Sequence, residues 1–565
     1  MKLHAINQQN NISSKTQNPT FKGGDEFLRF LATNQAWGAN GTDLAFMVLP
    51  RSATDMIDRG FLAGAETTRR EIMGTVNDTS IGAYGLAAGY ALSLGLKKHC
   101  PIEWNQIFAS KETIDHVANT WNDKLVKNLS RKDVFKSLLS NLEGFEPAST
   151  NASADGFVKL SNIDELAQKL DDAVDNIDVK KWRRSNEKAV IKAKIVENTG
   201  VDKKFRINSN GKNISTTLDS VLDDFFKLVK TFDSEAVKNT IANEKSSSVK
   251  SFAESNIVKN LKKLGRNKAI GGIGIAALVG MSVQPINMYL SKKKTGTDGF
   301  VGVEGREKDN SFKFKLIKLG AMTAFGAMML KTIGCGPKKF IDHMAYKDMF
   351  TPTIDQFKGV YGLTIMSRIG VSRDKDECRE VCIKDTLGFL NWLVLGNFVN
   401  KIVAKTLDPH LIKYNEKECG KGAWNRLTKS TLKTHDEIMF EAMKKSGLSP
   451  IIKETVTKNG KTITRDTVMK YSQMKKAIGT TSAPAVNALK HIKALNIAQI
   501  IGYAYTGIVL GWGIPKINIA MTNNREKQRK EKLQQMLHSK ENFEFVKQRM
   551  STINNQNSDL TKKSA

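Results

Sequence analysis

The distribution of apolar residues divides the chain into long uncharged runs and charged, amphipathic stretches. Two of the runs, Ala269 to Leu290 and Ala494 to Pro515, each contain twenty-two residues without a charge. As helices they would be about 33 Å long, which matches the hydrocarbon thickness of a bilayer, about 30 Å. We therefore predict that both runs enter a membrane.

Three shorter uncharged runs occupy residues 79–96, 319–330 and 386–400. They lie at or below the length of about 17–25 residues that a spanning helix needs. Each is compatible with a short span, a re-entrant or interfacial segment, or a helix buried in a globular core. The sequence does not choose among these alternatives.

The charged regions show the periodicity of amphipathic helices. Leu218, Val221, Leu222 and Phe225, for example, recur at the spacing of one helix face. We predict that such faces pack on each other in soluble helical regions. The paired acids of these helices are expected on their solvated surface: Asp171, Asp172, Asp223 and Asp224.

Strand signals are few. Alternating β-formers flank Asn459-Gly460 over residues 454–465, which predicts a hairpin with a tight turn. Asn208 to Gly211 also has the composition of a turn. The predicted fold class is therefore mainly α: a helical membrane protein with amphipathic soluble helical regions and one or two small β-hairpins.

These patterns suggest eight regions. They are a disordered tail (1–24), an N-terminal helical unit (25–98) with the run 79–96, a basic soluble helical region (99–263), a central apolar hairpin (264–340) with runs 269–290 and 319–330, a helical region (341–415) with the run 386–400, a polar region (416–491) with the hairpin 454–465, an apolar helix (492–522) with the run 494–515, and a basic helix with a disordered tail (523–565).

Small residues recur four apart in the apolar runs, a pattern that lets helices approach closely in a bilayer. The candidate packing residues are Gly85, Gly89, Gly272, Ala276, Gly280, Gly507 and Gly511. Such faces pack against a neighbouring helix, in the same chain or in a second copy. Self-association of the protein is therefore one predicted interaction.

The formal net charge is +30, which favours polyanions, either nucleic acid or an anionic lipid surface. One basic patch surrounds Trp182, and a second follows the last apolar run. The candidate anionic-surface contacts are Lys180, Lys181, Arg183, Arg184, Arg525, Lys527, Arg529, Lys530 and Lys532. An anionic membrane is the favoured partner because the second patch lies directly behind a predicted span; nucleic acid is the alternative.

No pattern points to a catalytic, cofactor or metal site. The sequence lacks a Gly-x-Ser-x-Gly elbow, a His-Glu-x-x-His motif and a complete phosphate loop. Cys378 and Cys382 share a helix face, but the other ligands of a zinc site are missing from their surroundings. We expect no cofactor and no metal, and an enzyme is the least supported class.

The two halves of the chain echo each other weakly. Arg70-Glu71-Ile72-Met73 resembles Arg379-Glu380-Val381-Cys382, and Pro285-Ile286-Asn287 resembles Pro515-Lys516-Ile517-Asn518. Internal repeats of membrane proteins leave traces of this kind and place sites where the halves meet. The unequal gaps between these anchors favour chance similarity instead.

Asn18-Pro19-Thr20-Phe21-Lys22-Gly23 resembles the short N-terminal FKG motif of uncharacterised proteins from gut-dwelling, non-photosynthetic relatives of cyanobacteria. The block from Trp37 to Asp78 and the Pro-Ile-Asn exits are similar to stretches in multi-helix membrane proteins of that group. The resemblance covers about a third of the chain. It implies a bacterial membrane protein of unknown activity and carries over no catalytic residues.

We therefore expect a membrane-integrated structural or interaction component in the bacterial cytoplasmic (inner) membrane, with soluble regions mostly cytoplasmic. The alternatives are a soluble basic nucleic-acid-binding protein and a transporter- or channel-like protein. An ion path is disfavoured because the two long runs contain no ionisable residue. Lysines stand at both ends of nearly every run, so the positive-inside rule leaves the orientation open.

Overall fold

A computed structural model of the chain describes residues 24–33, 40–209, 211–244, 251–296, 298–301, 307–349, 351–394, 398–458 and 461–563. The described chain is mainly α-helical, with small antiparallel sheets. The fold class predicted from the patterning is therefore confirmed. The predicted N-terminal tail, apart from Gly24, and the turn at Asn459-Gly460 lie outside the described residues.

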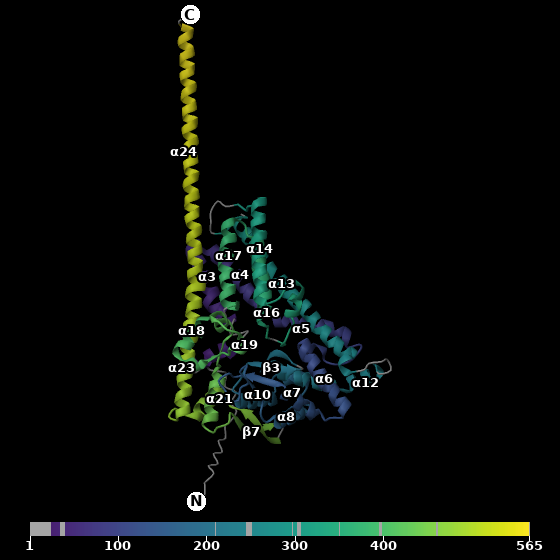
Figure 1. The fold of residues 1–565 in the computed structure, drawn as a ribbon. Coiled ribbons are helices and arrows are strands. Elements are labelled where there is room, and N and C mark those ends of the chain that lie inside the picture. The colour runs from purple at the N-terminus through teal and green to yellow at the C-terminus, as the bar shows by residue number, and fades with distance from the viewer. Residues whose placement is uncertain are drawn as a thin grey trace.

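Three helices are long and apolar enough to cross a membrane, and they stand on the same side of a globular domain (Figure 1). They are α13 (Asn256–Thr295), α14 (Phe312–Ile333) and a continuous helix from Ala483 to Phe545. The last comprises α23 (Ala483–Tyr505), the π-helix η7 (Thr506–Gly513) and the first part of α24 (Ile514–Lys563). Each contains one of the predicted runs, and the run 319–330 is extended to a helix of spanning length.

Shorter helices complete this bundle. They are η1 (Leu44–Val48), α3 (Leu49–Arg59), α4 (Phe61–Thr79), α5 (Ile81–Leu96), α16 (Ile354–Val371), α17 (Lys375–Phe389), η5 (Leu390–Val394) and α18 (Phe398–Leu407). The run 79–96 forms α5, which packs along α13. The run 386–400 is divided among α17, η5 and α18, with residues 395–397 outside the described chain.

The globular domain is built from the charged regions between the apolar runs. Its helices are α6 (Lys111–Lys127), α7 (Arg131–Ser140), α8 (Ile163–Asn176), α9 (Val179–Trp182), α10 (Asn186–Thr199), α11 (Leu218–Phe232), α12 (Glu235–Glu244), α19 (Glu416–Cys419), α20 (Ala423–Lys429), α21 (His435–Lys445) and α22 (Tyr471–Ile478). One hydrophobic core joins residues of both the 100–264 and the 404–498 regions. The domain is therefore assembled from two distant parts of the chain.

A four-stranded antiparallel sheet of order β2-β1-β3-β4 packs in this domain. Its strands are β1 (Leu142–Phe145), β2 (Phe157–Lys159), β3 (Lys204–Ser209) and β4 (Lys212–Thr217). Only the turn between β3 and β4 was predicted. The predicted hairpin forms as β7 (Ile451–Lys458) paired with β8 (Lys461–Val468), with Lys458 opposite Lys461. Short strands β5 (Ile412–Lys413) and β6 (Thr431–Leu432) form a third sheet.

The paired acids Asp223 and Asp224 of α11 do not lie on a solvated surface, which corrects the prediction for them. Both are buried because α11 is covered on nearly all sides in the centre of the globular domain. Asp223 pairs with buried Lys188 at 2.6 Å. Burial and the neighbouring Asp223 raise the pKa of Asp224 well above its ordinary value. On α8, in contrast, Asp171 is half-buried and Asp172 is exposed.

Two buried histidines are expected to make the globular domain sensitive to acid. Burial lowers the pKa of both His116 and His435, so the unfolded chain, with a histidine pKa of about 6.5, binds protons first. Stability is therefore full above about pH 6.5 and falls as the pH drops below that value. We expect the apparent Tm of the full chain in detergent to fall from about pH 7.5 to about pH 5.5.

The double variant His116→Asn, His435→Gln is the matched control. Its amides preserve the contacts of His116 Nδ1 with Ser209 Oγ and of His435 Nε2 with Asn496 Oδ1. Without titrating rings, the decrease in Tm should become smaller. An unchanged decrease would assign the acid sensitivity to other groups.

Candidate functional site: an ionic cluster between two halves of the bundle

Helices α3 and α4 are amphipathic, but their polar faces are buried and their apolar faces point outward, the reverse of the arrangement in a soluble protein. On α4, Glu66, Arg70 and Glu71 are buried, whereas Phe61 and Val76 are 70% and 58% exposed. On α3 the buried side chains are polar, while Ile57 is 79% exposed. Apolar side chains pointing outward over buried charges suit a helix whose outer surroundings are lipid.

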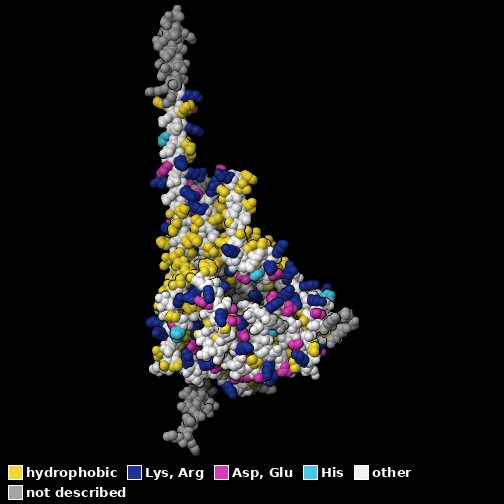
Figure 2. Space-filling model, in the orientation of Figure 1, with side chains coloured by type: hydrophobic (Ala, Val, Ile, Leu, Met, Phe, Trp, Pro, Cys, Tyr) yellow, Lys and Arg dark blue, Asp and Glu magenta, His cyan; other side chains and the backbone are white. Residues whose placement is uncertain are grey.

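The surface of the bundle agrees with this arrangement. Figure 2 shows hydrophobic side chains gathered over the bundle, between the globular domain and a group of basic side chains at the far end. Leu278 of α13, Leu319 of α14 and Ile508 of η7 are each at least 60% exposed. Contiguous exposed apolar surface of this extent is typical of an interaction site or a membrane contact.

The inward-facing charges meet in one place, which we call the ionic cluster. It consists of six basic and six acidic side chains: Arg51, Arg59, Arg70, Arg368, Arg373, Lys384, Asp55, Glu66, Glu71, Glu377, Glu380 and Asp385. The formal charges balance. Most of these side chains are buried, and the remaining two, of Arg59 and Lys384, are 4% and 11% exposed. Burial of this many charges is costly unless each is paired.

Two of the ion pairs join helices that are far apart in sequence and have matching positions. Arg59 of α3 contacts Glu380 of α17 at 2.5 Å, and Arg368 of α16 contacts Glu71 of α4 at 3.5 Å. In each case the arginine lies twelve residues before the glutamate of its own half. Each arginine therefore reaches the glutamate of the other half.

The two proline exits also have matching environments. Pro285 in α13 leaves the carbonyl of Met281 without its helical donor, and Ser367 of α16 donates to that oxygen at 2.6 Å. Pro515 follows the π-helix η7, in which each N–H bonds to the carbonyl five residues earlier. Because proline has no N–H, the carbonyl of Leu510 is left without its helical donor. Nε of Arg51 on α3 donates to that carbonyl at 3.2 Å. Helix α16 of one half and helix α3 of the other thus each cap the long helix of the opposite half.

A third similarity lies shortly beyond each proline, although the arginine involved in the first half is Arg69, next to the Arg70 that the echo aligns with Arg379. Asn287 and Ser291 of α13 accept hydrogen bonds from Arg69 at 2.9 and 3.1 Å. Asn518 and Thr522 have the same four-residue spacing on α24, and Arg379 donates to Thr522 Oγ1 at 2.8 Å. Thr522 in turn donates to Glu380.

These contacts define a first half (η1 to α5, with α13) and a second half (α16 to α18, with α23 to α24). Both α13 and α23 begin in the core of the globular domain and leave it in the same direction. Helix α13 packs on α16, and η7 packs on η1 and α3, so each long helix crosses to the other half. The sequence echo is therefore matched by the contacts of the folded chain.

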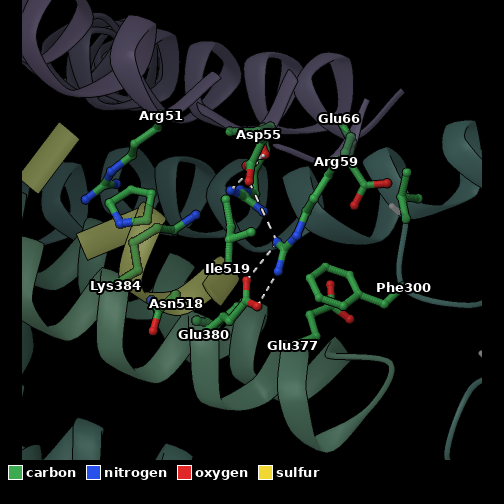
Figure 3. Close-up of a pocket in the computed structure, with 16 residues that line it drawn as sticks. Arg51, Asp55, Arg59, Glu66, Phe300, Glu377, Glu380, Lys384, Asn518 and Ile519 are labelled. Atoms are coloured by element: carbon green, nitrogen blue, oxygen red, sulfur yellow. Dashed lines mark hydrogen bonds and ion pairs between the residues drawn. The ribbon is translucent and has the colours of Figure 1, made fainter. Parts of the chain in front are cut away.

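A narrow cavity opens into the ionic cluster where the halves meet (Figure 3). Its volume is about 30 Å³, room for roughly one or two water molecules. Figure 3 shows side chains of α3 and α4 facing those of α17, with Asn518 and Ile519 of α24 beside them. Phe300, after α13, covers Arg59 and Arg373, with ring-centroid distances of 4.9 and 5.6 Å.

The predicted small-residue positions lie at helix contacts within the chain. Gly85 and Gly272 face each other, so a Cβ built on Gly272 would lie 2.8 Å from Gly85 Cα. Gly89 lies against Lys268, and Ala276 is fully buried. Gly280 lies against Thr364 of α16. Gly507 and Gly511 lie against Phe46 of η1.

The predicted basic patches lie outside the ionic cluster. Trp182 is fully buried and stacks on Phe226 at 3.9 Å between ring centroids, so its ring is not available to a base. Lys180 contacts Glu103 at 3.0 Å and Arg183 contacts Asp348 at 3.0 Å. The other members of the patches are exposed: Lys181, Arg184, Arg525, Lys527, Arg529, Lys530 and Lys532. Among them, Arg525 pairs with Asp376 at 3.0 Å.

The sequence did not indicate the ionic cluster. The two long uncharged runs contain no ionisable residue. The charges of the ionic cluster come mainly from α3, α4, α16 and α17, which are too polar to be recognised as membrane helices. The available signal was the echo of Arg70-Glu71 and Arg379-Glu380. Comparing the positions twelve residues before Glu71 and Glu380 would have added Arg59 and Arg368 to this echo.

Comparison with known proteins adds no assignment: no family model, curated protein or solved structure matches the chain.

Proposed function

We propose that the protein is a membrane-integrated carrier whose two halves move against each other around the ionic cluster. The observation that carries the proposal is the pair of matching ion pairs, Arg59–Glu380 and Arg368–Glu71, buried where the halves meet. Ionisable residues enclosed among membrane helices are costly and mark solute pathways. In transporters built from repeats, the site lies between the repeats.

The arrangement also provides a bistable element. Pairs that join the halves hold them together only while both charges remain in contact. Opening toward either side would hydrate the cluster and separate those pairs, and water would then compensate the charges. The cavity of about 30 Å³ is too small for a solute larger than a few atoms, so this structure corresponds to the closed arrangement.

The outward-facing apolar surfaces of α3 and α4 support a membrane protein over a soluble nucleic-acid-binding protein. A structural or interaction component remains the rival within the membrane class. It predicts a cluster sealed from solvent on both sides, whereas a carrier requires solvent access from each side in turn. The accessibility of the cavity therefore separates the two.

The location that we propose is a bacterial cytoplasmic membrane, with the globular domain in the cytoplasm. The five cysteines form no disulfide among the described residues, which suits a reducing compartment. The exposed part of α24 lies at the opposite end of the bundle (Figure 1). If the long helices cross the membrane, that part of α24 faces the other side.

Thiol labelling in vesicles tests these proposals. On a cysteine-free background, Ala63→Cys places a thiol in the cavity wall, where the native side chain is 5% exposed. We expect a membrane-impermeant reagent to label it in vesicles of either orientation. Labelling from one side only, or from neither, would contradict a carrier; labelling from neither would support the structural role.

Two further cysteines act as controls. Ile57→Cys, on the outward face of α3, should stay unlabelled because lipid covers it. Lys527→Cys, on the exposed part of α24, should be labelled from one side only, in vesicles whose sidedness is known from their preparation. Labelling of Lys527→Cys from the cytoplasmic side would reverse the proposed orientation.

A further inference from the structure

One end of the cavity contains donors that the protein does not use. Arg51 is 1% exposed, and neither Nη1 nor Nη2 has a hydrogen-bond partner among the described residues. Asn518 is 2% exposed, and neither atom of its amide has a partner there. Burying a donor without a hydrogen-bond partner destabilises a fold, and a charged donor does so more strongly.

A second cation adds to this end. The nearest carboxylate to Lys384 Nζ is that of Glu71, at 3.7 Å. All three residues line the cavity, and in Figure 3 Arg51, Lys384 and Asn518 lie on the side away from Phe300. They come from α3, α17 and α24, so both halves contribute to the group.

The carboxylates at the other end are already occupied. Glu380 is paired with Arg59 at 2.5 Å. Glu66 and Glu377 are both paired with Arg373, at 2.6 and 2.9 Å. The positive charge of Arg51 is therefore not matched by a direct ion pair among the described residues, although the whole cluster is neutral.

We propose that Arg51, Lys384 and Asn518 bind an oxyanion, a carboxylate or phosphate group of the solute. The two Nη atoms of a guanidinium form a fork that matches two oxygens of such a group. The ammonium of Lys384 and the amide N–H of Asn518 supply further donors. The inference rests on the proposed carrier function and names the chemical class of its solute.

Anion-dependent stabilisation of the purified full chain in detergent tests this site. Inorganic phosphate and acetate are each titrated against chloride at constant ionic strength, with the apparent Tm as the readout. A ligand that binds only the folded state raises Tm by mass action. We expect a saturable rise with at least one of the two probes. If neither probe raises Tm above chloride, the proposed site is overturned.

Asn518→Asp is the decisive variant because it is nearly isosteric and places a carboxylate in the wall of the cavity that Arg51 also lines. It should raise the Tm measured in chloride and weaken the anion response at least tenfold. Lys384→Gln should weaken the response without raising the Tm in chloride. Lys540→Glu, which changes an exposed charge on the same helix as Asn518, should leave the response unchanged.

The outcomes separate this inference from the carrier proposal. An anion response with labelling of Ala63→Cys from one side only would indicate an anion receptor rather than a carrier. Labelling from both sides without an anion response would retain the carrier and remove the oxyanion as its solute. An anion response unaffected by Asn518→Asp would place binding elsewhere and overturn the site.

Discussion

Replacing Arg368 with methionine is expected to lower the free energy of unfolding by about 3–5 kcal/mol, the cost of breaking a buried ion pair from one side. Arg368 is 1% exposed and contacts Asp385 at 3.1 Å and Glu71 at 3.5 Å. Glu71 retains its ion pair with Arg70 at 3.0 Å. The main cost of the substitution is therefore the buried charge of Asp385, which loses its contact with Arg368. Thermal unfolding in detergent should show a decrease in Tm of roughly 2–4 °C for a chain of this length.

Two comparisons make this result specific. Adding Asp385→Asn to Arg368→Met should recover part of the loss, because the unpaired buried charge is removed. Arg525→Met breaks the pair with Asp376, in which the arginine side chain is 54% exposed, and should cost at most about 1 kcal/mol. Equal losses for Arg368→Met and Arg525→Met would show that the ionic cluster is not shielded from water.

Gly272→Ala is expected to destabilise the protein by about 1–3 kcal/mol, the usual cost of overpacking. A Cβ at this position would lie 2.5 Å from Tyr346 Oη and 2.8 Å from the backbone of α5 at Gly85. Tyr346 is held by its hydrogen bond to the carbonyl of Ile81 at 2.9 Å. Neither neighbour can withdraw without separating α5 from α13.

Gly274, two residues further along the same helix, is the matched control. A Cβ there meets nothing within 4 Å, so Gly274→Ala should gain up to about 1 kcal/mol from helix propensity alone. The two variants should therefore move the apparent Tm in opposite directions. A decrease of similar size for both would show that general changes in α13, and not contact with α5, control stability.

Much of the secondary structure was predictable from local patterns. The long uncharged runs lie in α13, α14, α23 and η7. They could be recognised in the sequence because the ability of a helix to cross a bilayer depends on its length and composition. The β7–β8 hairpin followed from its alternation around a two-residue turn. The sheet of β1 to β4 was missed, since β1 and β2 are short strands and β1 also pairs with β3, which is distant in sequence.

The candidate site was not predictable from the same patterns. A helix such as α4 has the charge content of a soluble helix, and its amphipathicity does not say which face is covered. Only the fold shows that Glu66, Arg70 and Glu71 point inward while Phe61 points outward. The sign of amphipathicity depends on whether water or lipid surrounds the helix, and that is a property of the assembled bundle.

The sequence by itself determined the helices that are long and apolar enough to cross a membrane, the charged helical domain and the echo of Arg-Glu and Pro-Ile-Asn segments. Tertiary structure decided what the echo means: Arg59 meets Glu380 and Arg368 meets Glu71, each across the two halves. The physical reason is that a buried charge must find an opposite charge. Here each arginine finds it some three hundred residues away in the chain, a distance that no local pattern can bridge.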